Sequence, residues 1–199
     1  MNDMCIQAQK MGLEGIVFTE HVDLVPHDHQ YGFFRPKEYL AEIDRNRRIF
    51  DNNLQVFAGI ELGEIHRYRA QVQKIIDQEN YDVVVGSLHW INDVLFYDPE
   101  FVRHRSAESV YLEYMEELCE LCWTGGFDVL AHFDVVKRVL PKNHSVAAWP
   151  RVVEYMRDAL RGMVKNQIAL EINTWTVRNG MSETSAPGWL VSEFRRMGG

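Results

Sequence analysis

The hydrophobic pattern of the chain alternates between two periods. Short apolar runs rich in β-branched residues predict strands, and segments with apolar residues three or four positions apart predict helices. The expected strands are 15–19, 55–60, 82–88, 127–131 and 168–172. The expected helices are 3–11, 36–53, 68–80, 106–126, 149–166 and 187–196.

Helices that alternate with strands predict a parallel sheet, and the run 82–88 has the continuous apolar character of a strand covered on both faces. The fold class is therefore α/β, with mainly parallel strands in an open sheet or a barrel. The chain starts on a helix with no strand before it and stops after a helix with no strand after it. A barrel would place a strand at both positions, so we expect one domain, 1–199, truncated at both ends.

One ligand-type residue follows each of four expected strands: His21, Glu61, His89 and His132. Carboxyl ends of parallel strands lie on one face of a sheet, so these side chains should converge. A single histidine at such a position is usually an ordinary polar residue, but three histidines and one glutamate at successive strand ends are hard to explain by chance. Imidazoles with a carboxylate suit Zn, Mn or Fe, and a pair of such metals is typical of phosphoester hydrolysis.

Four short motifs at these strand ends, in this order, resemble the polymerase-and-histidinol-phosphatase (PHP) family. They are residues 18–21 (FTEH), 59–62 (GIEL), 86–89 (GSLH) and 131–134 (AHFD). The segment 170–174 (LEINT), followed by Arg178, resembles the histidinol-phosphatase branch. Each motif is weak alone, but their order and placement cover nearly the whole chain.

The resemblance implies a distorted seven-stranded α/β barrel, here incomplete, that holds two or three divalent metal ions (Zn, Mn or Fe). It implies that Glu61 bridges two metals, that His89 and His132 complete the shell of one, and that His21 belongs to a third. Glu61, His89 and His132 are thus the expected catalytic residues, and the family reaction is attack of a metal-activated hydroxide on phosphorus. Glu64 is a candidate to orient one of these ligands without binding the metal itself.

The sequence departs from the family at both ends. The family opens with an H-x-H at the end of a first strand and closes with a D-x-H at the end of its last strand. Here the H-x-H formed by His27 and His29 lies in a long loop and does not follow a strand, and no D-x-H is found. Both carry metal ligands in the family, and the four ligands that remain do not make a closed trinuclear centre. Glu61, His89 and His132 with water still make a workable catalytic shell for one metal. Missing edge strands would also expose unpaired backbone, so we expect lower stability than in the family, or pairing of the chain into a homo-oligomer.

A phosphorylated substrate needs cationic partners besides the metals. Arg178 lies in the expected loop after the fifth strand, and a guanidinium can bind phosphate oxygens in a bidentate way. Lys137 and Arg138 follow His132 by about one turn and could also reach the substrate, although solvated surface charge is the commoner role of such residues. Asp134 could orient His132.

Net charge, apolar runs and cysteine positions limit the partners, location and redox chemistry expected of the protein. The net charge of −8 argues against a nucleic-acid partner. No apolar run is long enough to span a membrane and no signal peptide is recognisable, so a cytoplasmic location is expected. Cys119 and Cys122 form a C-x-x-C inside a helical stretch, where structural residues are more common than a redox pair.

The sequence therefore predicts a metal-dependent phosphomonoester hydrolase acting on a small phosphorylated substrate, foremost histidinol phosphate, in histidine biosynthesis. Two alternatives stay open. The same fold could act on another phosphomonoester, such as phosphotyrosine, or the chain could be an inactive remnant with a binding role.

Overall fold

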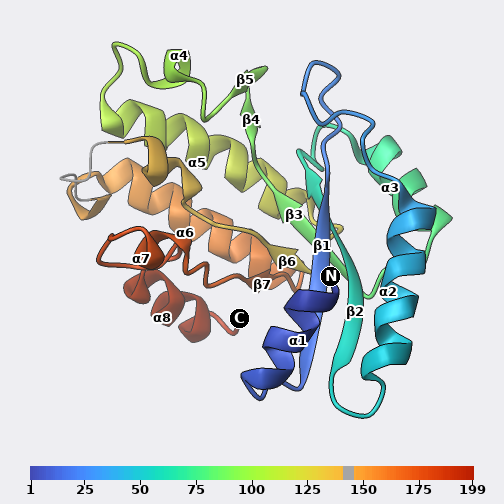
Figure 1. Ribbon diagram of the computed structural model, residues 1–199. Helices are drawn as coiled ribbons and strands as arrows, with labels where there is room; N and C mark the ends of the chain where they lie inside the picture. The colour runs from blue at the N-terminus through green and yellow to red at the C-terminus, as the bar shows by residue number, and fades with distance from the viewer. Residues whose placement is uncertain (141–145) are drawn as a thin grey trace. The chain divides into compact units, whose positions relative to one another are not determined.

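Five strands join in one sheet in the order β1-β2-β3-β6-β7, and Figure 1 shows them with their flanking helices. The pairs β1–β2 and β6–β7 are parallel. The mainly parallel sheet with alternating helices that the sequence predicts is confirmed. The strands are β1 (Gly15–Val22), β2 (Gln55–Gly63), β3 (Val83–Ser87), β6 (Val129–Leu130) and β7 (Ala169–Leu170).

All six expected helices form in the computed structural model, which describes residues 1–140 and 146–199. They are α1 (Asn2–Lys10), α2 (Pro36–Phe50), α3 (Arg69–Gln78), α5 (Ala107–Thr124), α6 (Pro150–Lys165) and α8 (Gly188–Arg196). Ser106 caps α5, where its side chain accepts a hydrogen bond from the backbone N–H of Ser109. Within the described residues, no helix combines the length and apolar character needed to cross a membrane.

Several short elements have no clear signal in the sequence. They are the hairpin β4 (Trp90–Ile91) and β5 (Val94–Leu95), the helices α4 (Pro99–Val102) and α7 (Trp175–Arg178), and the 3-10 turns η1 (Val135–Val139) and η2 (Val146–Ala148). The strands β6 and β7 are shorter than the apolar runs 127–131 and 168–172 that predict them. Elements of two to five residues are too short to show a period, and tertiary contacts fix them instead.

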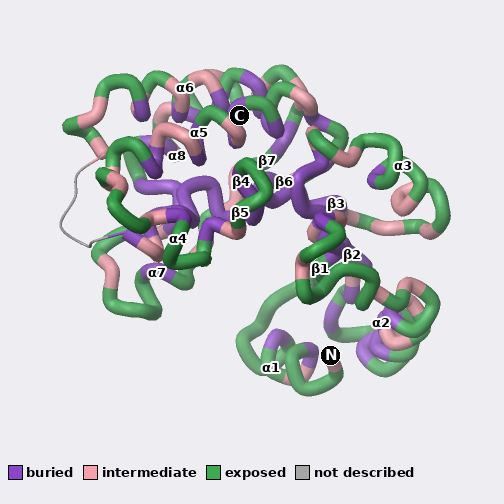
Figure 2. The backbone as a smooth tube through the Cα atoms, turned by 90° about the horizontal axis from the view of Figure 1, so that it is seen from above, coloured by how far each residue is buried: buried purple, intermediate pink, exposed green. Residues whose placement is uncertain are grey.

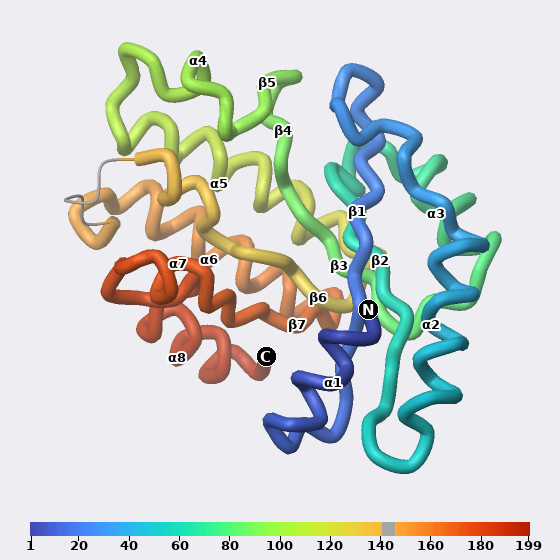
Figure 3. The backbone as a smooth tube through the Cα atoms, viewed as in Figure 1, coloured from blue at the N-terminus to red at the C-terminus, as the bar shows by residue number. Residues whose placement is uncertain are grey.

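The chain divides into two compact units, which are described separately. Unit 1 contains Met1–Leu62 and Tyr68–Val85, and unit 2 contains Gly63–Arg67 and Gly86–Gly199. The path of unit 1 can be followed in Figure 3 from α1 through β1 and α2 to β2. Its core packs α1 and α2 against β1 and β2, with Cys5, Ile43 and Ala58 fully buried.

A buried tyrosine ties α2 to both strands of unit 1. The Tyr39 hydroxyl lies 2.7 Å from the carbonyl oxygens of Phe18 and of Gly59, and it accepts a 3.0 Å hydrogen bond from the Gly59 backbone N–H. Burial raises the pKa of Tyr39 to about 12, so the hydroxyl keeps its proton. This contact sets the position of α2 near the carboxyl ends of β1 and β2, where His21 and Glu61 lie.

In unit 2, α5 and α6 pack along each other. Figure 2 shows buried residues on both helices and on the strands beside them. Residues of the two helices with no exposed area include Met115, Leu118, Cys122, Met156 and Leu160. Burial raises the pKa of the Cys119 thiol to about 12 and that of the Cys122 thiol well above its ordinary value. Both cysteines are therefore inert packing residues, in line with the structural interpretation of the C-x-x-C.

The segment Gly63–Arg67 is anchored to α5 by one carboxylate. Glu117 Oε1 lies 2.6 Å from His66 Nε2 and accepts a 2.5 Å hydrogen bond from Arg67 Nε. Burial of Glu117 acts to raise its pKa, but the hydrogen bonds and charges of His66 and Arg67 outweigh it and lower the pKa to about 2. This ion pair holds the segment that carries Glu64.

We expect Gly162→Leu to destabilise the chain, because a Cβ at Gly162 would lie 3.0 Å from the backbone of Cys122 and Trp123 in α5. Overpacking of this kind costs about 1–3 kcal/mol of unfolding free energy, measurable by urea denaturation. Gly188→Ala is the matched control, since no atom lies within 4 Å of a Cβ there. Equal stability of Gly162→Leu and wild type would show that α5 and α6 are not in close contact.

We expect Glu117→Gln to lower the unfolding free energy at pH 7 by about 2 kcal/mol, the scale of a hydrogen bond to a charged group. The folded pKa is about 2 against an ordinary value of 4.5, so the carboxylate stabilises the fold above pH 4.5. This contribution disappears as the pH falls from 4.5 towards 2. Urea denaturation across this range should therefore show a smaller pH dependence for Glu117→Gln than for wild type, with the exposed Glu154→Gln as control. An unchanged pH dependence would contradict the role of the ion pair.

Candidate functional site

The strand-end residues of unit 1 are brought together by sheet register. β1 and β2 pair so that His21 lies opposite Glu61. His21 Nε2 is 3.8 Å from Glu61 Oε2, and His21 Nδ1 is 3.8 Å from Asp23 Oδ2. The Glu61 side chain is 13% exposed and that of His21 44% exposed. The result is an imidazole and a carboxylate side by side at the carboxyl ends of two parallel strands.

The strand-end histidines of unit 2 face each other. His89 lies two residues after β3 and His132 two residues after β6, and these chain segments are joined by a 2.9 Å hydrogen bond from Ala131 N to the Gly86 carbonyl. His89 Nε2 and His132 Nε2 are 3.3 Å apart. Both residues are buried, with 8% and 9% exposure.

This spacing fits a shared metal ion. Two imidazole nitrogens bound to one tetrahedral Zn²⁺ at about 2.0–2.1 Å are separated by about 3.3 Å. With both rings protonated at Nδ1, the two Nε2 lone pairs face each other and can bind one cation; with one ring protonated at Nε2, the same contact is an N–H···N hydrogen bond. The donor set of the pair therefore suits a divalent cation, as the sequence predicts for these positions.

Two carboxylates, the buried Glu64 and the half-buried Glu171, hold the backbone of these histidines. Glu64 Oε1 accepts hydrogen bonds from the backbone N–H of His89 at 2.6 Å and of Trp90 at 2.9 Å. Glu171 Oε2 accepts one from the backbone N–H of His132 at 2.5 Å. The sequence indicated a role for Glu64, but not for Glu171. The acidic residue in the LEINT motif was the available signal, and its target could not be read from the chain.

Arg138 lies beside an aromatic ring in unit 2. Its guanidinium carbon is 4.2 Å from the centre of the Trp175 ring. Its two terminal nitrogens make long hydrogen bonds, 3.3 Å to the Tyr97 hydroxyl and 3.4 Å to Asn173 Oδ1. The stacking fixes the plane of the guanidinium, and the long hydrogen bonds leave it able to donate to an anion.

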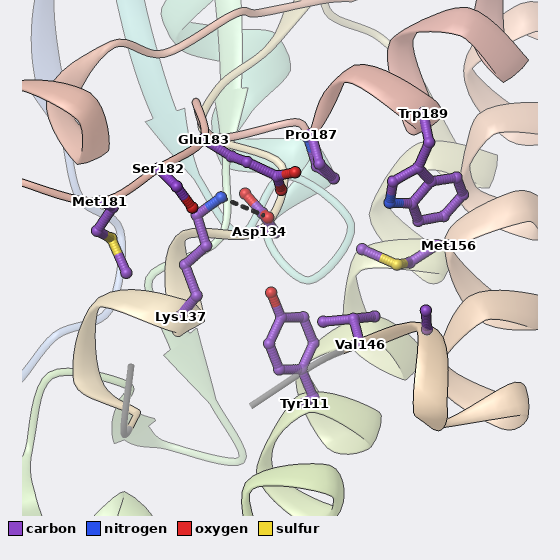
Figure 4. Close-up of a pocket in the computed structure, with 11 residues that line it drawn as sticks. Tyr111, Asp134, Lys137, Val146, Met156, Met181, Ser182, Glu183, Pro187 and Trp189 are labelled. Carbon is purple, nitrogen blue, oxygen red and sulfur yellow. Dashed lines mark hydrogen bonds and ion pairs between the residues drawn. The ribbon is translucent and has the colours of Figure 1, made fainter. Parts of the chain in front are cut away.

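Lys137 has a different environment. Its ammonium donates to Asp134 Oδ2 at 2.8 Å and to the Thr184 carbonyl at 2.7 Å. Figure 4 shows this ion pair in the wall of a cavity of about 390 Å³, with Trp189 and Met156 on another side. Lys137 therefore neutralises a buried carboxylate. Asp134 also accepts hydrogen bonds from Ser185 Oγ and Ala186 N, so its contacts tie the 184–186 segment to η1.

Arg178 is the last residue of α7, rather than part of a loop as the sequence suggests. Its side chain is exposed. Among the described residues, its guanidinium has no hydrogen-bond or ion-pair partner, and it is accessible to a ligand. The structure thus gives the three predicted cationic residues three environments: stacked for Arg138, ion-paired for Lys137 and exposed for Arg178.

The sequence matches the PHP domain family over residues 1–175. It is 28% identical over 190 residues to a histidinol-phosphatase of Lactococcus lactis subsp. lactis, a match that covers 94% of this chain and 70% of that protein. It is also 28% identical to a probable histidinol-phosphatase of Clostridium acetobutylicum, over 80% of this chain and 61% of that protein. The chain therefore spans about two thirds of the length of these relatives.

Solved structures agree with this relationship. A histidinol phosphate phosphatase from Lactococcus lactis, complexed with Zn, L-histidinol and phosphate, superposes with a TM-score of 0.87 at 28% identity, over 98% of this chain and 74% of that one. A putative histidinol phosphatase from Listeria monocytogenes shares the fold, with a TM-score of 0.82 at 15% identity over 99% of this chain and 85% of that one. The chain belongs to the PHP domain family, among histidinol-phosphatase-like phosphoric monoester hydrolases.

Proposed function

We propose that this protein is a metal-dependent phosphatase that hydrolyses histidinol phosphate to histidinol. The observation that carries the proposal is the pair of buried histidines whose Nε2 atoms face each other at 3.3 Å, in a chain of the PHP domain family. The named relatives support the substrate, since they are histidinol-phosphatases and one is solved with Zn, L-histidinol and phosphate.

The proposed metal ligands are His21, Glu61, His89 and His132, with Glu61, His89 and His132 as the catalytic set. His89 and His132 offer two neutral nitrogens at the spacing of a shared cation. His21 and Glu61 offer a nitrogen and a carboxylate in direct register. Zn, Mn or Fe bound here would act as a Lewis acid on the phosphate and lower the pKa of a water molecule.

Arg138 and Arg178 are the proposed phosphate-binding residues. Stacking on Trp175 keeps the Arg138 guanidinium in one plane, so little entropy is lost when it binds two phosphate oxygens. Arg178 is exposed and uncommitted among the described residues. A direct contact between Lys137 and the phosphate remains a prediction, because the Lys137 ammonium already donates hydrogen bonds to Asp134 and Thr184.

Two other functions are compatible with the fold. Another small phosphomonoester is possible, because the identity to the named relatives is 28% and a pocket can change its substrate within one family. A binding role without catalysis is the other, and metal content separates it. An active centre holds at least two metal ions per chain, and an inactive remnant holds one or none.

We expect His132→Asn to remove a metal ligand and lower phosphatase activity on histidinol phosphate by more than about 100-fold. Elemental analysis of the same preparation should show less bound metal per chain than in wild type. His104→Asn is the matched control, because His104 is exposed and is not one of the proposed metal ligands. Full activity of His132→Asn would rule out the proposed centre.

We expect Arg138→Met to reduce kcat/KM for histidinol phosphate by about 10–100-fold, the scale of a lost charged hydrogen bond. The effect should appear mainly in KM, with bound metal unchanged, because Arg138 contacts the phosphate rather than the metal. Arg195→Gln, at the exposed end of α8, should behave like wild type. If Arg138→Met keeps the wild-type KM, the phosphate is held elsewhere.

A further inference from the structure

We infer that Glu64 and Glu171 are a matched pair of positioning residues that hold His89 and His132 in the geometry a shared metal requires. The inference rests on the proposed function and names residues of unit 2 that touch neither metal nor substrate. Each carboxylate acts on one histidine through that histidine's own backbone N–H. Two side chains 107 positions apart in sequence thus fix the backbone from which each imidazole projects.

Glu64 controls the turn that follows β3. Its side chain has no exposed area, and one oxygen receives the N–H groups of both His89 and Trp90. Burial of a carboxylate is expensive unless hydrogen bonds compensate it. The hydrogen bonds that compensate the burial of Glu64 include those from the backbone N–H groups of His89, a proposed metal ligand, and of Trp90. A second anchor fixes Glu64 itself, because its N–H donates to the Ser87 carbonyl at 3.1 Å.

Glu171 stabilises a strained turn after β6. His132 has a φ of +28°, a region that a residue with a Cβ rarely occupies because it is strained. Its N–H is directed to Glu171 Oε2 at 2.5 Å. Glu171 is held in turn, since its own N–H donates to the Leu130 carbonyl at 3.2 Å. Strain of this kind persists where the surroundings enforce it, and it is concentrated at functional sites.

Asn173 extends this arm to the proposed phosphate anchor. Its Nδ2 lies 3.3 Å from both oxygens of Glu171. Its Oδ1 accepts hydrogen bonds from the Trp175 N–H at 2.9 Å and from Arg138 at 3.4 Å. Glu171 and Asn173 therefore link the backbone of His132 to the guanidinium of Arg138. A change at Glu171 should disturb both metal and phosphate binding, whereas a change at Glu64 should disturb the metal alone.

The hydrogen bonds can be tested without metal, by the amide proton shifts of His89 and His132 in ¹⁵N-labelled chain. An N–H bonded to a carboxylate resonates downfield, and the neutral amide of a Gln variant should weaken that effect. We expect Glu64→Gln to move the His89 amide upfield and leave that of His132 in place, and Glu171→Gln to do the reverse. Each variant thus serves as the control for the other. Unmoved amides in both variants would overturn the assignment.

The consequence for the metal site can be measured by competition of a chelator for Zn²⁺. We expect Glu64→Ala and Glu171→Ala to weaken Zn²⁺ binding by about 10–100-fold, as is usual for groups that orient metal ligands. The Gln variants keep an acceptor oxygen and should recover part of the affinity. Val152→Ala, in the core of unit 2, gives a lower Tm without touching the histidines and should bind Zn²⁺ as wild type does.

The Zn²⁺ measurement distinguishes failure of the positioning role from failure of the proposed function. If wild type binds Zn²⁺ and the Ala variants bind it equally well, the positioning role is wrong and the proposed function stands. If wild type binds no Zn²⁺, Mn²⁺ or Fe²⁺, the proposed function is wrong, and this assignment with it. A loss of affinity in Val152→Ala as large as in Glu171→Ala would also overturn the assignment, because general destabilisation would then explain the effect.

Discussion

The close approach of two imidazoles in a buried place is the constraint on which the candidate site depends. Neutral lone pairs 3.3 Å apart have no favourable interaction unless a proton or a cation lies between them. The backbone must therefore hold them together against side-chain freedom. It does so in unit 2 through sheet hydrogen bonds that bring β3 and β6 together and through two carboxylates that receive the histidine N–H groups.

Parallel strands explain why the ligand-type residues occur where they do. A strand end is where the main chain leaves the ladder, so a side chain there is free to point at a ligand while the strand behind it stays rigid. In unit 1 the same logic places His21 opposite Glu61 by register alone. The Tyr39 hydroxyl then ties α2 to both strands and steadies their ends.

Lys137 and Arg138 of unit 2 differ in whether a buried carboxylate neutralises their charge. Lys137 and Arg138 are adjacent in η1 but have opposite tasks, because a 3-10 turn sends successive side chains in different directions. Lys137 points to the buried carboxylate of Asp134 and offsets its desolvation. Arg138 points to the Trp175 ring, which orders the guanidinium without neutralising it. Of these two residues, Arg138 is therefore the one whose positive charge stays available to a ligand.

The sequence by itself determined the α/β class, the five strands and six main helices, and the four ligand-type residues at strand ends, because periodicity and strand order are local properties of the chain. It also carried the family resemblance, which the domain match confirms. The short elements and the roles of Glu171, Asn173 and Trp175 were decided by tertiary structure alone. Glu171 bonds to a backbone N–H 39 positions away and Arg138 stacks on a ring 37 positions away, and no local pattern specifies which distant partner a side chain will meet.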